Sequence, residues 1–159
     1  MTKIEYKFGE EIADADYNGE DHTLMAYYHS KSKCIKVSHY YQNSNFPVTS
    51  EIGPLPDLPK KISVAQGALE NEFVIAVVYN TIRELRLFKV TIDVSEPEEG
   101  KEKKFKVIIH EDRPIFGVKT ASILTLKEPK KIDKGEEEEN QIVDTYLSIL
   151  LYSTESSSN

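Results

Sequence analysis

The 159-residue sequence has no tryptophan, one cysteine, two methionines and seven glycines. The single cysteine, Cys34, excludes an internal disulfide, and no signal peptide is predicted, so we expect a reducing compartment, nuclear or cytoplasmic. The longest apolar run, Val74 to Tyr79, has the length of a strand and is far too short for a membrane helix. These absences predict an intracellular protein with no membrane contact.

The motifs of common catalytic sites are also missing. The sequence has no glycine-rich phosphate loop, no Gly-x-Ser-x-Gly elbow and no Cys-x-x-Cys pair. Of the four histidines, only His29 and His39 flank one predicted turn, whereas a metal site needs several converging ligands. The carboxylates between Glu10 and Asp21 lack the ligand order of an EF-hand. We therefore predict no catalytic residue, no cofactor and no metal, and a protein that is not an enzyme.

The charge of the chain is acidic, with 27 Asp and Glu against 20 Lys and Arg and a formal net charge of -7. A uniformly acidic surface repels phosphate backbones, so any contact with nucleic acid requires a local basic patch. Hydrophobic residues make up 39% of the chain, which is enough for one domain with its own core.

Strand patterns dominate what is present. Alternating apolar and polar residues predict half-buried strands at 4–8, 35–40 and 85–90. The continuously apolar run Phe73 to Tyr79 predicts a strand buried on both faces. Segment 140–151 also fits an apolar helical face, but its β-branched and aromatic content favours a strand. Further strands are predicted at 23–29, 48–52, 105–109, 115–126 and 142–152.

Three segments are predicted to connect these strands. Pro54, Pro56 and Pro59 form a rigid, extended connector. Charge-rich solvated loops are expected at Glu96–Lys104 and Lys127–Asn140, and the second contains the acidic run Glu136 to Glu139.

The sequence repeats itself at a shift of about fifty residues. Leu24 to Ser30 aligns with Val74 to Asn80, and the alignment continues without a gap from Ile35 onto Leu85. A third, imperfect copy of the apolar run follows at Leu147 to Ser153. Each unit has a leading outer strand, a short strand, a buried apolar strand and an alternating strand. Four antiparallel strands in about forty to fifty residues is the period of a β-propeller blade.

This unit resembles a blade of the WD-repeat family of β-propellers, and the resemblance covers most of the chain. The Gly-His and Trp-Asp pairs of that family are absent, and His39-Tyr40 and Lys89-Val90 stand where the second pair would close the alternating strand. The resemblance implies a degenerate, partial propeller of about two and a half blades, of the kind found in scaffold subunits. We expect an all-β repeat domain over 1–152, with units at about 3–47, 48–104 and 105–152 and a disordered tail over 153–159.

Such a partial propeller would be incomplete. A closed ring needs at least about four blades, and the third unit lacks its last alternating strand. The chain is then either a piece of a larger propeller or completes a sheet with a partner, because open sheet edges tend to associate. The alternative fold is a single β-sandwich in which the repeat is coincidental. We predict a non-enzymatic protein-interaction scaffold, a subunit of a larger intracellular complex whose protein partner covers the open edges.

A second function class follows from a group of lysines beside tyrosines, a mixture that stacks nucleic-acid bases. The stretch 33–40 also resembles strands of the propeller-type non-catalytic subunit of tRNA guanine-N7 methyltransferase. That resemblance implies a non-catalytic subunit of an RNA-modifying enzyme, with RNA as its partner. The alternative for the same residues is a solvated turn beside half-buried tyrosines. The candidate residues for contact with nucleic acid or a partner are Lys31, Lys33, Lys36, Tyr40 and Tyr41.

Overall fold

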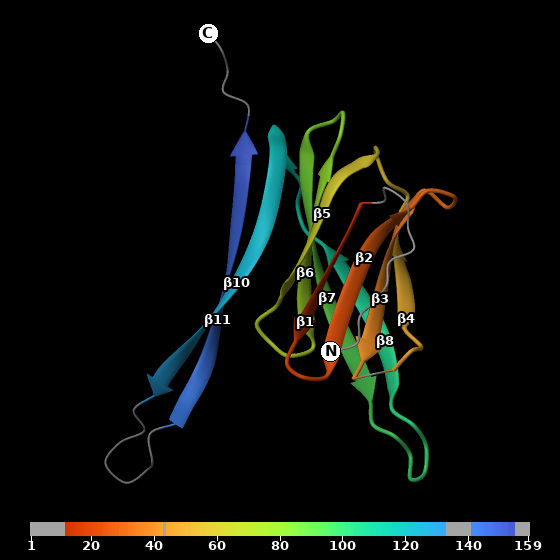
Figure 1. Ribbon diagram of the computed structural model, residues 1–159, viewed down its shortest axis with the longest axis vertical. Coiled ribbons are helices and arrows are strands. Elements are labelled where there is room, and N and C mark those ends of the chain that lie inside the picture. The colour runs from red at the N-terminus through yellow and green to blue at the C-terminus, as the bar shows by residue number, and fades with distance from the viewer. Residues whose placement is uncertain (1–11, 43, 133–140, 155–159) are drawn as a thin grey trace.

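The computed structural model describes residues 12–42, 44–132 and 141–154, with side chains described as far as Lys119 (Figure 1). The described chain is all-β, with antiparallel sheets and no helix, as the sequence predicts. None of its described elements is a helix that is long and apolar enough to cross a membrane. The predicted strand at 4–8, the acidic run Glu136 to Glu139 and most of the serine-rich tail lie outside the described residues.

The first sheet contains four antiparallel strands in chain order. Short turns join them because residues with left-handed backbone angles close the hairpins: Gly19 has φ 64° and Lys33 has φ 52°. The strands are β1 (Ala13–Asn18), β2 (His22–His29), β3 (Cys34–Tyr41) and β4 (Val48–Ile52).

The second sheet repeats this order with four consecutive strands, and the short strand β9 pairs with β7 beyond the end of β8. Its hairpin has the same register as the first one, since Leu24 pairs with His39 and Val74 pairs with Lys89. The sequence repeat at a shift of about fifty residues therefore corresponds to a structural repeat of the two sheets. The strands are β5 (Pro59–Gln66), β6 (Glu72–Tyr79), β7 (Glu84–Ser95), β8 (Lys104–Glu111) and β9 (Ile115–Phe116).

The third sheet is a long hairpin of β10 (Val118–Ile132) and β11 (Gln141–Thr154). The strand interpretation of segment 140–151 is confirmed, and the helical one is wrong. The prediction of a loop from Lys127 onward is also wrong up to Ile132, because those residues pair with Gln141–Tyr146. Cross-strand pairing outweighs the low strand propensity of a stretch rich in lysine and proline.

The sheets divide the chain one strand later than the predicted units 48–104 and 105–152. The strand expected to lead the second unit, Val48–Ile52, pairs backward with β3, and Lys104–Glu111 pairs backward with β7. The change of sheet occurs instead at the proline-rich segment 53–58, whose extended backbone carries the chain from one sheet to the next.

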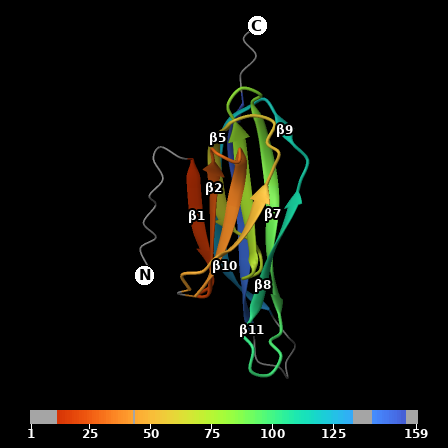
Figure 2. The same ribbon diagram turned by 90° about the vertical axis from the view of Figure 1, so that its right-hand side faces the viewer.

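The second sheet lies between the other two (Figures 1 and 2). On one side, Leu24 and Val37 of the first sheet share a buried core with Phe73 and Ile75. On the other side, a smaller buried cluster joins the second sheet to β10 through Val118; its other members are Ala76, Val78 and Leu85. The continuous apolar run Phe73 to Tyr79 is thus buried on both faces, as predicted.

The stacking of the sheets has a direction. Leu24, Ala26 and Ile35 face the second sheet, and the residues fifty positions later face the third. Those later residues are Val74, Ala76 and Leu85, which share one face of the second sheet. Each sheet therefore presents the same face to the next one along the chain, in a head-to-tail arrangement.

Two side chains of β1 fasten the first sheet to the second. The carboxylate of Asp14 accepts a hydrogen bond from the backbone N–H of Val64 at 2.7 Å. The amide of the fully buried Asn18 donates to the carbonyls of Leu69 and Glu72 at 2.6 and 2.9 Å. Polar bonds between inner strands thus supplement the apolar contact.

Candidate partner-binding cleft

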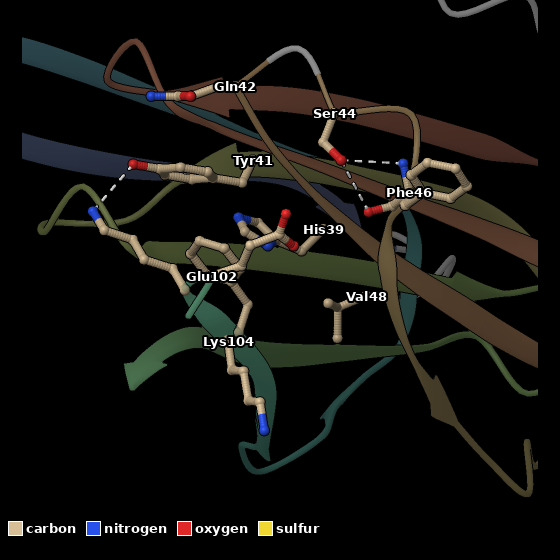
Figure 3. A pocket seen from close by; sticks show the side chains of 10 residues that line it. His39, Tyr41, Gln42, Ser44, Phe46, Val48, Glu102 and Lys104 are labelled. Carbon is tan, nitrogen blue, oxygen red and sulfur yellow. Dashed lines mark hydrogen bonds between the residues drawn. The ribbon is translucent and has the colours of Figure 1, made fainter. Parts of the chain in front are cut away.

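A cleft of about 860 Å³ opens where the connection between β3 and β4 meets the loop between β7 and β8 (Figure 3). Its volume lies within the range of about 300 to 1,000 Å³ that is usual for ligand pockets. Residues of β3 form one wall, and residues 102–105 form the opposite wall. Gln42, Ser44 and Phe46 form the rim.

The base of the cleft is an aromatic cluster built from both sheets. Tyr41 stacks on Phe105 with ring centroids 4.6 Å apart and planes inclined by 34°. The ring of His39 lies 5.3 Å from Phe105 and 5.1 Å from His22. Alternation along β2 and β3 directs His22, His39 and Tyr41 to the same face, toward the second sheet. The cluster therefore depends on sheet-to-sheet packing.

The two histidines form a neutral hydrogen-bonded pair. His22 Nδ1 and His39 Nε2 lie 2.9 Å apart, so one ring nitrogen donates its hydrogen to the other. Burial, followed by the neighbouring His22, lowers the pKa of His39 from 6.5 to about 4. Burial likewise lowers the pKa of His22. His39 Nδ1 is buried and has no hydrogen-bond partner among the described residues, which leaves one polar atom unsatisfied in a cleft-lining side chain.

The rim carries an exposed aromatic side chain, Phe46, with 87% of its surface accessible. The hydroxyl of Ser44 accepts a hydrogen bond from the N–H of Phe46 at 3.2 Å and lies 3.4 Å from its carbonyl oxygen. Because Phe46 precedes Pro47, its backbone favours an extended conformation. Ser44 and Pro47 together hold Phe46 at the mouth of the cleft.

The facing wall supplies two positive charges and one negative charge. Lys103 Nζ lies 5.5 Å from the ring centroid of Tyr41 and 3.5 Å from its hydroxyl oxygen. Lys104 is exposed, and neither lysine has a carboxylate partner among the described residues. Glu102 lies between Lys101 and Lys103 in sequence and also lines the cleft. The cleft wall thus has a net charge of about +1 when each of these side chains is ionised.

Only one of the five predicted contact residues, Tyr41, lines this cleft. Lys31 and Lys33 belong to the turn at the other end of β3, about 20 Å away at the usual rise of a strand. Lys36 is paired with Glu51 at 3.6 Å. The side chain of Tyr40, next to Tyr41 in the strand, points to the opposite face of the sheet. The structure therefore does not bring the five residues together.

His29 and His39, which flank the predicted turn, do not meet. In the register of this hairpin His29 pairs with Cys34 and makes contact with the hydroxyl of Ser32, whereas His39 meets His22. The described residues contain no group of three or more histidine, cysteine or acidic side chains placed to hold a metal.

Sequence reasoning missed most of the cleft. The proximity of His22 to His39 could have been predicted from the sequence. A turn at Ser30–Lys33 sets a register that places His22 diagonal to His39 on one face of the sheet. Phe46, Lys103 and Phe105 carry no such local signal. They join the site only through the contact between two sheets.

A second feature open to partners is the edge of β11. The first two sheets each include four consecutive strands, whereas the third contains β10 and β11 alone among the described residues. Along Gln141–Thr154 every described backbone pairing of β11 is with β10. The other edge of a 14-residue strand therefore has no strand partner in the described part of the chain.

Comparison with family models, with curated proteins and with solved structures finds no match to this chain.

Proposed function

We propose that this protein is a non-enzymatic interaction scaffold, a subunit of a larger intracellular complex. The observation that carries the proposal is the third sheet, which has two strands, β10 and β11, in the described part of the chain. The exposed backbone groups of such an edge pair readily with a strand from another chain. Partner binding by strand addition needs no catalytic residue, which agrees with the absence of catalytic motifs from the sequence.

The head-to-tail stacking supports a partial propeller of the WD-repeat type as the framework of this scaffold. A two-layer sandwich is complete when its two inner faces meet. Here the middle sheet is apolar on both faces, and equivalent residues form the two successive interfaces. The same stacking could therefore continue with a further sheet. A repeat of this kind ends when the ring closes or when a different surface covers the last unit.

The scaffold proposal is tested with proline substitutions in β11. Adjacent residues of a strand direct their N–H groups to opposite edges of that strand. One of the two substitutions Ser148→Pro and Ile149→Pro therefore removes a hydrogen bond to β10. The other removes only an N–H that points to the outer edge. We expect one variant to be destabilised by about 1 to 3 kcal/mol, because it leaves a carbonyl of β10 without its donor, and the other to remain folded. The folded variant should capture at least tenfold less of the partner proteins bound by the tagged wild-type chain, measured by quantitative mass spectrometry.

Ser148→Ala is the matched control, because it keeps the backbone donor and should capture the same partners as the wild type. Full capture by a folded proline variant would show that β11 is not the docking edge. A wild-type chain that purifies as a monomer without partners would contradict the scaffold function itself.

The alternative function, as a subunit of an RNA-modifying enzyme, has less support. Lys31, Lys33, Lys36, Tyr40 and Tyr41 do not share one surface, and Lys36 is already paired with Glu51. The acidic net charge of -7 adds repulsion against a phosphate backbone.

A further inference from the structure

We propose that the cleft between the β3–β4 connection and the β7–β8 loop binds a peptide segment of a partner protein, one that carries an aromatic side chain next to a carboxylate. This goes beyond strand addition at β11, since it uses side-chain recognition on a surface that does not include β11. Both surfaces serve an interaction scaffold, but neither needs the other to be occupied.

The first argument is the exposure of Phe46. A ring that is 87% accessible at the mouth of a cleft leaves apolar surface in water, and two contacts of Ser44 with its backbone keep it there. Burial of a phenylalanine side chain contributes about 1.5 to 3 kcal/mol. An incoming apolar side chain would bury Phe46 and the aromatic base of Tyr41 and Phe105 together.

The second argument is the aromatic character of that base. Tyr41 and Phe105 already stack with each other, and Lys103 lies over the ring of Tyr41. Aromatic pairs add about 0.5 to 1.5 kcal/mol beyond the area they bury. An aromatic anchor in the partner is therefore favoured over an aliphatic one.

The third argument is charge. Lys103 and Lys104 face the cleft without a described carboxylate partner, and Glu102 offsets one of their two charges. One carboxylate of a peptide complements the net charge of about +1 on this wall. A polyanion does not, because the loop before the cleft adds Glu96 and Glu99, whereas Glu98 is paired with Lys101. Charge complementarity thus favours a peptide over single-stranded nucleic acid. Charge and apolar surface therefore both point to a peptide in this cleft.

The test uses a short fluorescein-labelled peptide in which phenylalanines alternate with aspartates, titrated with the full chain and followed by fluorescence anisotropy. Phe46→Ala should weaken binding about tenfold or more, as expected for a central aromatic contact. Phe116→Ala is the matched control, because Phe116 is 72% exposed and lies in β9, outside the cleft. Both side chains are exposed, so both variants should fold like the wild type.

A Lys103→Glu, Lys104→Glu double variant should also lose binding, and a peptide with lysine in place of aspartate should bind weakly to the wild type. The proposal is overturned if the acidic peptide does not bind at millimolar concentration or binds Phe46→Ala and Phe116→Ala equally. Tighter binding of an oligouridine probe that is lost in Phe46→Ala would assign the cleft to nucleic acid and would also overturn it. The isolated chain is used throughout, so failure here leaves the β11 experiment unaffected.

Discussion

At the scale of single residues, the His22–His39 pair is the most unusual feature of the core. Two imidazoles share one hydrogen bond at 2.9 Å beside Phe105, with His39 almost completely buried. Folding favours the neutral form of both rings, because a charge there would be desolvated and would face its neighbour. The core at this site is therefore sensitive to acid.

We predict that stability falls as the pH is lowered from about 6.5 to about 4. The folded-state pKa of His39, about 4, lies below its unfolded value of 6.5, so protons bind preferentially to the unfolded chain in this window. The stability contributed by the neutral ring is complete above the unfolded pKa and declines by up to about 3 kcal/mol toward the folded pKa. Urea unfolding at several pH values measures this slope.

His39→Phe should flatten that slope, since the ring that titrates is gone. His110→Gln should leave it unchanged, because His110 is exposed in β8. An equally steep pH dependence in His39→Phe would show that carboxylates, and not this pair, set the acid sensitivity.

At the scale of elements, alternation and continuous apolar runs were enough to place the strands at 23–29, 35–40 and 73–79 close to their observed bounds. These signals are local, because each strand shows its own buried faces in its own sequence. Segment 127–132 was missed because its strand form depends on a distant partner, Gln141–Tyr146.

The turn between β5 and β6 depends on a glycine that the sequence did not single out. A Cβ at Gly67 would lie 2.5 Å from Cβ of Glu72 and 2.8 Å from its carbonyl carbon. The N–H of Gly67 also donates to the carbonyl of Glu72 at 2.7 Å, which fixes the close approach.

We predict that Gly67→Ala destabilises the protein by about 1 to 3 kcal/mol, the usual cost of inserting an atom into a packed site. Thermal unfolding followed by circular dichroism measures the loss. Ala68→Gly, at an exposed position of the same turn, should have a smaller effect. Equal melting temperatures for wild type and Gly67→Ala would mean that the turn opens at little cost.

At the scale of the whole molecule, the repeat at a shift of fifty residues predicted two equivalent four-strand sheets, but not the position of the sheet boundaries. The sequence repeat identifies which residues are equivalent, but it does not indicate which sheet an outer strand joins. The cleft could not be foreseen for a related reason. Phe46 lies in the connection between two strands of the first sheet and Phe105 lies in the second sheet, so only the packing of one sheet on the next brings them to one site.

The contact between the first two sheets should depend strongly on Asn18. We predict that Asn18→Ala lowers the free energy of unfolding by about 2 kcal/mol, because its amide makes two buried hydrogen bonds to the second sheet. Chemical denaturation provides the measurement. Asn80→Ala, at an exposed position, should change stability by less than about 0.5 kcal/mol. A similar small effect for both substitutions would mean that apolar contact alone joins the sheets.

Because the first sheet turns toward the second the same side that the second turns toward the third, the stack has a direction. Its two outer faces are therefore opposite faces of equivalent sheets. An assembly that contacts both outer faces of the stack must therefore hold the chain in one orientation. Two dissimilar neighbours bound to these two faces would be held in a fixed order.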